Sequence, residues 1–319
     1  MDIALHIMGR MLVSGHGAAM ERRMKRLWLT GLLLGSALCV AGIAIEWPAG
    51  KPVAVAASPS TKAPQRIVSL NLCADQYLLA LADRDQIAGL TRNAIDPDMS
   101  AAAAQAKGLR LLKGSAEEIL AINPDLILGM PARRGGVMAA LSGEHYRSVD
   151  VTLANSYADI VAQVRVIAHA VGHPERGEAL IARMDRDLAA IPRRQNAGVA
   201  AYYQRRGYLT GTGTLVDDLM TRVGLVNLAG RIGKPALSQL SLEELMVAQP
   251  DYLIVESAAE RVMDQGTEML HHPMLRDIKR LPLPQAWTVC GGPAYVRAAR
   301  SLADQLRAAP ARRSAAVTN

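Results

Sequence analysis

Arginine and aromatic side chains follow several of the short apolar runs in this 319-residue chain. Arg92, Arg133 and Arg205 each come shortly after such a run, and Tyr208 and Trp287 lie close to two others. A guanidinium group binds carboxylate or phosphate through two parallel hydrogen bonds, and flat rings lie well against cations. The combination suits a large, partly anionic metal chelate. For any single one of these arginines the alternative is an ordinary surface position.

Placement at the ends of predicted strands selects the candidate ligand-binding residues. In open α/β sheets, ligands bind beyond the carboxyl ends of the strands. We expect alternation along the pair Tyr202-Tyr203 to send one ring to the core and leave the other for the ligand. The candidates are Asn71, Cys73, Arg92, Met130 and Arg133 in the first half of the chain, and Tyr203, Arg205, Tyr208, Glu256, Trp287 and Cys290 in the second.

Cys73 and Cys290 are the two cysteines that follow residue 57. Exported cysteine pairs usually form disulfides. Here the two residues fall in different halves of the predicted fold, where a bridge would clamp the halves together. Buried free thiols are our first expectation. A disulfide and direct contact with the ligand remain open.

The residue types needed for catalysis or for a bare metal site do not occur together in this sequence. It contains no nucleophile elbow and no Ser-His-Asp set, and His271-His272 has no Cys or Glu at metal-ligand spacing. The segment from Gly211 to Val216 has Val where a dinucleotide fingerprint needs Gly or Ala, so we interpret it as a turn before a helix, with amides available to the ligand. We therefore expect no catalytic residue, no metal ligand and no intrinsic cofactor.

A repeated segment organises the rest of the chain. Residues 115–128 read SAEEILAINPDLIL, and residues 241–254 read SLEELMVAQPDYLI, an offset of 126 residues (241 − 115). In each copy a Ser and the second Glu have capping-box spacing, the proline ends the helix, and a short buried strand follows. The first Glu of each pair, Glu117 or Glu243, is left without a capping role. Two copies at this distance predict two similar lobes rather than a solenoid.

Strands alternate with helices on both sides of a long helical stretch, which predicts an α/β fold with two Rossmann-like lobes, each around a parallel sheet. A backbone helix over 174–191 starts at a proline and keeps apolar residues at helical spacing, so it is a rigid connection rather than a hinge. The ligand cleft is expected between the lobes. Further strands are expected at 67–70, 87–90, 109–112, 151–153, 199–203 and 287–289, and further helices at 157–171, 215–223 and 296–306.

The predicted domain layout follows from these elements. The N-terminal α/β lobe covers 58–156, the helical connection 157–192, the C-terminal α/β lobe 193–308 and a tail 309–319. Residues 58–319 hold 30 Lys and Arg against 26 Asp and Glu without a basic run, which argues against nucleic-acid binding.

Residues 1–57 have the features of an N-terminal export signal. Arg22, Arg23, Lys25 and Arg26 precede an apolar run over 27–45, and Ala54-Val55-Ala56 is a cleavage pattern, as in a secretory signal peptide. The alternative is an uncleaved membrane anchor, because the run is long enough to span a bilayer. We expect an exported, periplasmic protein.

From about Pro64 to Leu306 the chain resembles the periplasmic solute-binding proteins of ABC importers for cobalamin, ferric siderophores and haem, which have a rigid helical backbone between their lobes. The resemblance lies in Arg66-Ile67-Val68-Ser69-Leu70, both Glu-Glu segments with their Pro-Asp turns, Gly172-x-Pro174 and Gly224-Leu225-Val226-Asn227. It implies a non-enzymatic monomer that delivers a metal chelate to an ABC permease and ATPase complex in the inner membrane.

The resemblance also assigns a partner surface. In that family an acidic residue at the tip of each lobe docks onto arginines of the permease, and the matching positions are Glu117 and Glu243. A ferric siderophore or cobalamin is the expected ligand. Haem ranks lower because no Tyr or His ligand can be placed from the sequence, and an exported α/β enzyme is the rival from another class.

Overall fold

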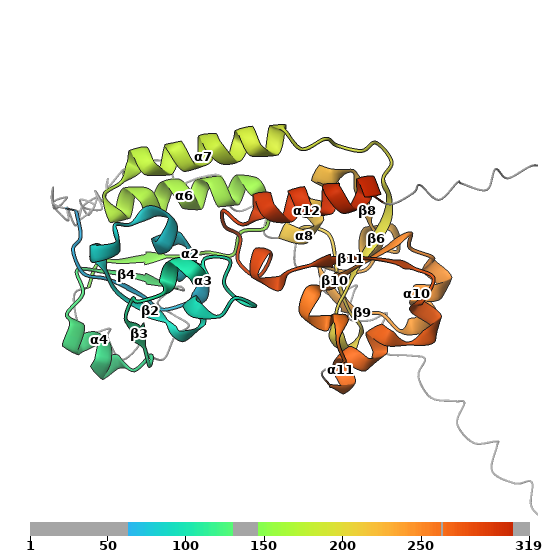
Figure 1. The fold of residues 1–319 in the computed structure, drawn as a ribbon, viewed down its shortest axis with the longest axis horizontal. Coiled ribbons are helices and arrows are strands. Elements are labelled where there is room, and N and C mark those ends of the chain that lie inside the picture. The colour runs from blue at the N-terminus through green and yellow to red at the C-terminus, as the bar shows by residue number, and fades with distance from the viewer. Residues whose placement is uncertain (1–62, 130–145, 263, 309–319) are drawn as a thin grey trace, which may run out of the picture. The chain divides into compact units, whose positions relative to one another are not determined.

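The computed structural model describes residues 63–129, 146–262 and 264–308 (Figure 1). Two separate sheets lie on either side, along the chain, of a pair of long helices. The predicted fold class, α/β with two Rossmann-like lobes, is therefore confirmed. The predicted signal peptide, the tail, Met130 and Arg133 lie outside the described residues.

The first sheet is wholly parallel, with the strand order β3-β2-β1-β4-β5. Its strands are β1 (Ile67–Ser69), β2 (Ile87–Thr91), β3 (Leu111–Leu112), β4 (Leu126–Gly129) and β5 (Ser148–Asp150). The connections carry the helices α2 (Leu72–Leu81), α3 (Ala103–Ala106) and α4 (Ala116–Ile122) and the 3-10 turns η1 (Arg84–Gln86) and η2 (Arg92–Ile95).

The second sheet has six strands in the order β11-β10-β6-β7-β9, and β8 also pairs with β6. Most of its pairs are parallel, but β7 runs antiparallel to both β6 and β9, so the prediction of a parallel sheet is wrong for this edge of the second lobe. The strands are β6 (Gly198–Tyr203), β7 (Tyr208–Thr210), β8 (Leu225–Asn227), β9 (Leu237–Gln239), β10 (Tyr252–Glu256) and β11 (Lys279–Leu283).

The second lobe also contains short helices and turns between these strands. Its α-helices are α8 (Leu215–Val223), α9 (Leu228–Arg231), α10 (Leu242–Ala248), α11 (Gln265–Glu268) and α12 (Tyr295–Ala308). Its 3-10 turns are η3 (Arg205–Gly207), η4 (Ser257–Glu260), η5 (Met269–His271), η6 (Pro273–Leu275) and η7 (Gln285–Trp287).

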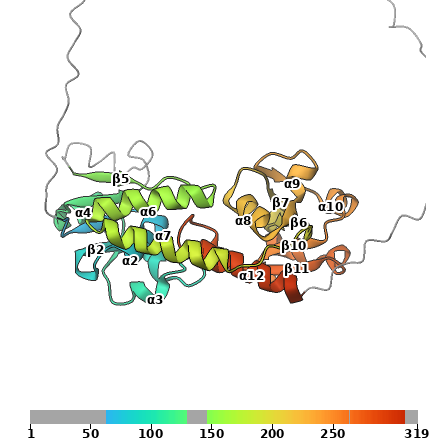
Figure 2. The ribbon, with the colours of Figure 1, turned by 90° about the horizontal axis from the view of Figure 1, so that it is seen from above.

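The two long helices, α6 (Tyr157–Val171) and α7 (Pro174–Ala189), run side by side (Figure 1; Figure 2). Gly172 ends α6 in the left-handed conformation at φ 87°, and Pro174 opens α7. A Cβ on Gly177 would come 2.5 Å from the Cβ of Ala168, so glycine is what allows the two helices to approach so closely. Helix α7 ends at Ala189, so the backbone helix is two residues shorter than the predicted 174–191.

Both faces of the sheets are buried, and the side chains alternate between them. Tyr252 and Ile254 of β10 join the large apolar cluster that includes α6, α7 and α12, whereas Leu253 and Val255 join a second cluster on the opposite face. Strands covered on both faces read as continuous apolar runs, which is why 126–128 and 253–255 could be found in the sequence. The large cluster includes residues of both sheets, so the lobes share one continuous core.

Two strand predictions are wrong. The last strand of the first sheet covers 148–150 rather than 151–153, and Leu153 is 77% exposed. The last strand of the second sheet covers 279–283 rather than 287–289. It contains Pro282, which an edge strand tolerates because one side of it makes no ladder hydrogen bonds. Because proline is disfavoured within strands, residues 279–283 did not suggest a strand.

Candidate functional site

In the first lobe, Asn71 caps the helix that follows the central strand. Its side-chain oxygen accepts a hydrogen bond from the amide of Ala74 at 2.8 Å, and its carbonyl accepts one from the Ser69 hydroxyl at 3.0 Å. Cys73 lies in the first turn of the same helix, α2. Asn71 is therefore held at the carboxyl end of β1, as predicted, and the amide nitrogen of its side chain makes no hydrogen bond with the residues that the structure describes.

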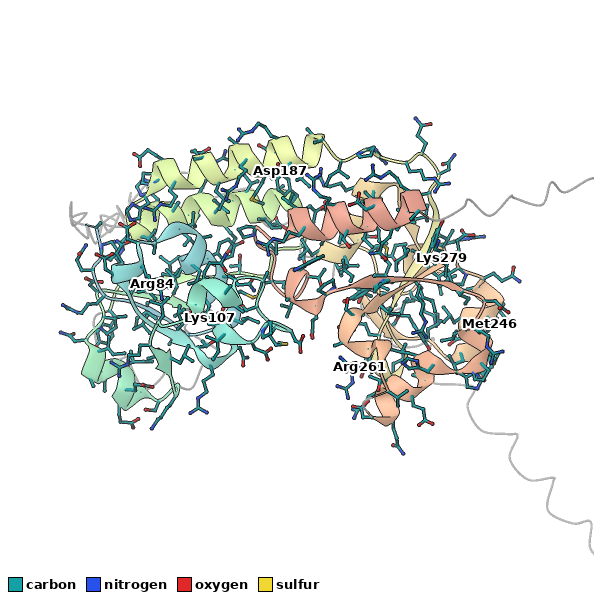
Figure 3. All side chains as sticks on the ribbon, in the orientation of Figure 1. Arg84, Lys107, Asp187, Met246, Arg261 and Lys279 are labelled. Carbon is teal, nitrogen blue, oxygen red and sulfur yellow. A yellow bond between two sulfur atoms is a disulfide. The ribbon has the colours of Figure 1, made fainter. Side chains whose placement is uncertain are left out.

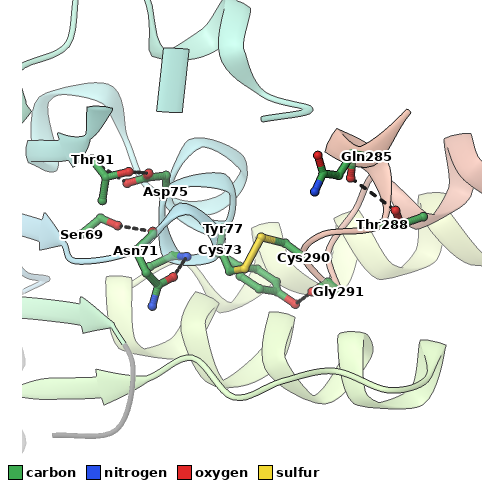
Figure 4. The surroundings of a disulfide bond; sticks show 11 residues. Ser69, Asn71, Cys73, Asp75, Tyr77, Thr91, Gln285, Thr288, Cys290 and Gly291 are labelled. Carbon is green, nitrogen blue, oxygen red and sulfur yellow. Dashed lines mark hydrogen bonds between the residues drawn. A yellow bond between two sulfur atoms is a disulfide. The ribbon is translucent and has the colours of Figure 1, made fainter. Parts of the chain in front are cut away.

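Arg92 directly follows β2, and the last residue of that strand, Thr91, is hydrogen-bonded to a buried carboxylate. Asp75 of α2 is fully buried and accepts hydrogen bonds from the Thr91 amide at 3.0 Å and from the Thr91 hydroxyl (Figure 4). Burial raises the pKa of Asp75, and the hydrogen bonds from Thr91 and Ser69 oppose that rise. Arg92 is exposed and makes no side-chain hydrogen bond or ion pair within the part of the chain that the structure describes.

In the second lobe, a tight turn between β6 and β7 presents two arginines. Arg206 has a left-handed backbone at φ 59°, and Gly207 follows at φ 74°. A Cβ on Gly207 would lie 2.9 Å from the carbonyl oxygen of Leu240, so only glycine fits there. The turn places Arg205 and Arg206 beyond the carboxyl end of β6.

Carboxylates surround Arg205. Its guanidinium pairs with Asp264, and its charge also acts on Glu256 at the end of β10. Burial raises the pKa of Glu256, while Arg205 and a hydrogen bond with Tyr202 lower it in part. Burial, followed by the charge of Glu256, raises the pKa of Tyr202 to about 12. The predicted residues Arg205 and Glu256 thus belong to one electrostatic cluster.

A pocket of about 400 Å³ lies beside this cluster, lined by Arg206, Asp264, Gln265 and Gly266. Like Arg92, the Arg206 side chain makes no hydrogen bond or ion pair with the residues described. Arg205 already pairs with Asp264, whereas the described side chains of Arg92 and Arg206 remain available to an anionic ligand.

The prediction that Tyr203 faces a ligand is wrong in this structure. Tyr202 is 3% exposed and joins the large apolar cluster, whereas Tyr203 is fully buried in the second cluster. Alternation holds, but helices cover both faces of the sheet, so neither ring is left over. The Tyr203 hydroxyl donates to the carbonyl of Leu240 at 2.7 Å.

The aromatic side chains that do remain at the strand ends are Tyr208 and Trp287. Tyr208 begins β7 and is 37% exposed, and its carbonyl accepts a hydrogen bond from the Gln204 amide at 2.8 Å. Trp287 lies in η7, beyond the end of β11, and is half-buried against the large apolar cluster. Both lie where a ligand at the carboxyl edge of the second sheet would meet them.

The expectation of two free thiols is also wrong. Cys73 and Cys290 form a disulfide with their Cα atoms 5.3 Å apart (Figure 4). The sequence suggested that the two cysteines lie on separate lobes. The structure instead brings the segment after β11 onto α2, where the Tyr77 hydroxyl donates to the carbonyl of Gly291.

The glycine-rich turn before α8 does not lie at this edge. Because β7 is antiparallel to β6, with Thr210 opposite Tyr202, the chain after Thr210 runs away from the carboxyl end of β6. The amide of Gly213 donates to Asp217 at 3.1 Å, which is a contact within the turn. The suggestion that this turn offers amides to the ligand is therefore wrong.

The repeated segments place both predicted docking residues in the first turn of a helix, Glu117 on α4 and Glu243 on α10, and both are exposed. Glu243 makes no side-chain hydrogen bond or ion pair within the described part of the chain. Its neighbour Glu244 completes a capping box with Ser241 and pairs with Lys234 at 3.0 Å.

The first copy is capped differently. The Ser115 hydroxyl accepts from the amide of Glu118 at 3.3 Å, but the Glu118 carboxylate binds the amide of Lys113 at 2.6 Å instead of the cap residue. Hydrogen bonds from its own amide and from Ser115 lower the pKa of Glu117. The predicted capping box is therefore complete only in the second copy.

A second cavity, of about 490 Å³, lies away from the strand ends, between α2, α3, α7 and the start of α12. Arg183, Asp187 (labelled on α7 in Figure 3) and Arg297 line it together with Gln76. The buried side-chain nitrogen of Gln76 has no hydrogen-bond partner among the described residues. No motif in the sequence groups these residues.

Across the described residues, no three His, Cys, Asp or Glu side chains are grouped so that they could hold a metal ion. In the same part of the chain, no helix combines the length and the apolar character needed to cross a membrane.

Known proteins share this sequence pattern and this fold. A cobalamin-binding protein of Halobacterium salinarum is 24% identical over 205 residues, which are 62% of this chain and 56% of that protein, so the match spans little more than half of the relative. The periplasmic heme-binding protein RhuT from Roseiflexus sp. RS-1, in its apo form, superposes with a TM-score of 0.61 at 25% identity and covers 76% of this chain and 97% of its own.

Two Vibrio cholerae structures show the same fold at lower identity. The periplasmic vitamin B12 binding protein BtuF has a TM-score of 0.56 at 17% identity and covers 77% of this chain and 98% of its own. The periplasmic heme binding protein HutB has a TM-score of 0.63 at 16% identity, with 76% and 98% covered. The sequence also matches the periplasmic binding protein family over residues 67–279, and on that extent the chain belongs to this family.

Proposed function

We propose that this protein captures a metal chelate, either cobalamin or a ferric siderophore, and delivers it to an ABC permease and ATPase complex in the inner membrane. The observation that carries the proposal is a pair of sheet-built lobes in a periplasmic binding protein, each with polar side chains at its carboxyl strand ends. Relatives named for cobalamin, vitamin B12 and heme support a chelate as the ligand. The protein then acts by binding and release, without catalysis and without an intrinsic cofactor.

The ligand-binding residues are proposed from both lobes. Asn71 and Arg92 serve from the first lobe, and Arg205, Tyr208, Glu256 and Trp287 from the second. Met130 and Arg133 are proposed from the sequence. The buried carboxyl of Glu256 and the side-chain amide of Asn71 suit the amide groups of a corrinoid, whereas Arg92 and Arg206 suit anionic groups on a siderophore.

The partner surface is proposed to be formed by Glu117 and Glu243. Each is an exposed carboxylate in the first turn of a short helix that occupies the same place in its half of the repeat. Arginines of a permease bind such carboxylates through paired hydrogen bonds. We also propose that residues 1–57 direct export to the periplasm and that the exported protein is a monomer.

Calorimetric titration of the protein purified from the exporting host tests the proposal. Cyanocobalamin, a ferric hydroxamate siderophore and hemin are titrated in turn, and at least one is expected to bind with a dissociation constant of about 1 μM or below. Failure of all three, together with turnover in a hydrolase screen, would support the rival class, an exported α/β enzyme.

Haem is the second candidate, and Tyr208 is the observation that favours it. Its ring is 37% exposed at the edge where the ligand is expected, and a tyrosine oxygen is one of the axial ligands that proteins offer to haem iron. A hemin complex with tyrosinate absorption would place this protein with the haem receptors.

A further inference from the structure

The two halves of the disulfide belong to the two chain segments that carry proposed ligand residues from opposite lobes. Cys73 lies two residues after Asn71, in the first turn of α2, and Cys290 lies three residues after Trp287 of η7 (Figure 4). The sequence separation of the cysteines is 217 residues. The backbone itself crosses from the first lobe to the second after α7, through residues 190–197, and the disulfide is a second covalent link between the lobes.

Two further contacts fasten the same segment to the first lobe. The hydroxyl of Tyr77, a residue that is 1% exposed, donates to the carbonyl of Gly291. A Cβ on Gly291 would lie 2.3 Å from the Cβ of Ala154, so the backbone there lies directly against the segment before α6. Residues 290–291 thus follow a strand of the second sheet yet are held by residues of the first lobe.

The segment around Trp287 is held in part by its own lobe, because Trp287 packs against the large apolar cluster and Thr288 interacts with Tyr202 of β6. The backbone hydrogen bonds described between Pro284 and Val289 are local, from Trp287 to Pro284 at 3.0 Å and from Thr288 and Val289 to Gln285 at 2.9 Å. They shape the turn but do not fix it against the first lobe. Its described bonds to the first lobe are those at Cys290 and Gly291, which add to the apolar core that the two lobes share.

We propose that the Cys73–Cys290 disulfide is a positioning element of the ligand site, which holds Trp287 at a fixed place relative to Asn71. This inference rests on the proposed function, because it assigns both residues to the site that captures the chelate. A site whose two sides are fixed before the ligand arrives loses less conformational freedom on binding, so affinity is gained without any new contact to the ligand. An oxidising compartment keeps such a bond intact.

The test compares the oxidised protein, purified after export, with the double variant Cys73→Ser/Cys290→Ser. Both carry Trp28→Phe and Trp47→Phe, so that Trp287 is the one tryptophan whether or not residues 1–57 are removed on export. The double variant is expected to bind the chelate at least about tenfold more weakly. Acrylamide is expected to quench its Trp287 fluorescence more strongly in the absence of ligand, because the segment that carries the ring is no longer tied to α2, and the accompanying loss of affinity is what assigns that position to the ligand site.

A matched control separates positioning from general loss of stability. Leu228 is fully buried in α9 and belongs to the second apolar cluster, which contains neither Trp287 nor the two cysteines, and Leu228→Ala lowers the unfolding temperature by creating a cavity. It is expected to keep both the affinity and the Trp287 quenching of the parent. If the control loses affinity as much as the cysteine variant does, the positioning role is overturned.

The remaining outcomes also decide the matter. If the double variant does not fold, the folded wild type is treated with a phosphine and then reoxidised, and affinity is expected to fall and to recover. Equal affinity and equal quenching with and without the bond overturn the inference while leaving the proposed function intact. If the oxidised wild type binds none of the three chelates, the proposed function itself fails.

Discussion

Asp125 and Asp251 make the same hydrogen bond in the two lobes. Asp125 accepts from the amide of Arg66 at 2.9 Å, just before β1, and Asp251 accepts from the amide of Val199 at 2.8 Å, at the start of β6. Both belong to the Pro-Asp turn of the repeat, and each ties its own strand, β4 or β10, to the central strand of its sheet. The repeat therefore preserves a contact as well as a sequence.

Removal of this carboxylate should destabilise either lobe. Asp251→Ala leaves the Val199 amide without its acceptor, and we expect a loss of about 1–2 kcal/mol in the free energy of unfolding. Asp251→Asn keeps one acceptor oxygen and should lose less. Denaturant unfolding at neutral pH measures both variants, and a change below about 0.5 kcal/mol for the Ala variant would contradict the structural role.

The adjacent glutamates of α10 should separate docking from stability. Glu243→Gln is expected to reduce uptake in cells while leaving chelate affinity and the unfolding temperature unchanged, because its carboxylate has no partner among the described residues. Glu244→Gln is the matched control. It weakens the bonds with Ser241 and Lys234, so it should lower the unfolding temperature and spare uptake.

The same reasoning applies to the first lobe with a weaker contrast, since Glu117 interacts with Ser115. Reversal of both Glu117 and Glu243 to Arg should abolish transport with ligand affinity intact. Loss of affinity in that double variant would count against a permease-docking role.

The sequence predicted the elements whose signals are local. Helix α6 was expected at 157–171 and α8 at 215–223, and both are found there, because capping residues and glycines define their ends. The capping box of Ser241 and Glu244 was likewise predicted from the spacing of the two residues. The position of Tyr203 was predicted wrongly because it depends on what covers the second face of the sheet. Only the fold shows that both faces are covered, which puts Tyr203 in the core.

Long-range partners were also beyond the sequence. Cys73 and Cys290 are 217 residues apart, and only the return of the chain from β11 to α2 brings them together. Asp75 carried a weak signal, a single carboxylate among the apolar residues of α2, but its partner Thr91 follows from the pairing of β1 with β2. Contacts of this kind are set by topology.

Asp75 should make stability depend on pH in an identifiable direction. Its folded pKa is raised above the ordinary 3.8 by burial, so the folded protein holds this proton more tightly than the unfolded chain. Its favourable contribution is therefore present below 3.8 and is lost as the pH rises through the raised value. Asp75→Asn does not titrate. We expect its free energy of unfolding, relative to that of wild type, to increase with pH across this window.

Urea unfolding of both proteins at several pH values between about 4 and 8 measures that difference. Above the raised pKa of Asp75, the difference in the free energy of unfolding between the variant and the wild type should become constant. A difference that does not change with pH would show that the proton on Asp75 is not coupled to folding.

Tyr295 joins α12 and α8 of the second lobe to α6 of the helical connection. Its hydroxyl donates to Asp218 and accepts from Nε of Arg222 at 3.0 Å, and its ring stacks on Tyr157 at a centroid distance of 5.6 Å. Tyr295→Phe keeps the stacking but removes both hydrogen bonds, and we expect a loss of about 1–2 kcal/mol in the free energy of unfolding. In the Asp218→Asn background the same change should cost less, because the two residues share one bond.

Tyr208 should distinguish a haem receptor from a corrinoid or siderophore receptor. If its phenolate oxygen binds haem iron, Tyr208→Phe will remove tyrosinate absorption from the hemin complex and weaken hemin binding by at least about tenfold. A cobalamin site would use Tyr208 through ring contact and a single hydrogen bond, so its affinity should change only about twofold to fivefold. Tyr252→Phe is the control, because that ring is 5% exposed and starts β10, at the opposite end of the strand from Glu256. An unchanged hemin spectrum in the Tyr208 variant would remove this residue as an axial ligand, and with it the observation that favours haem.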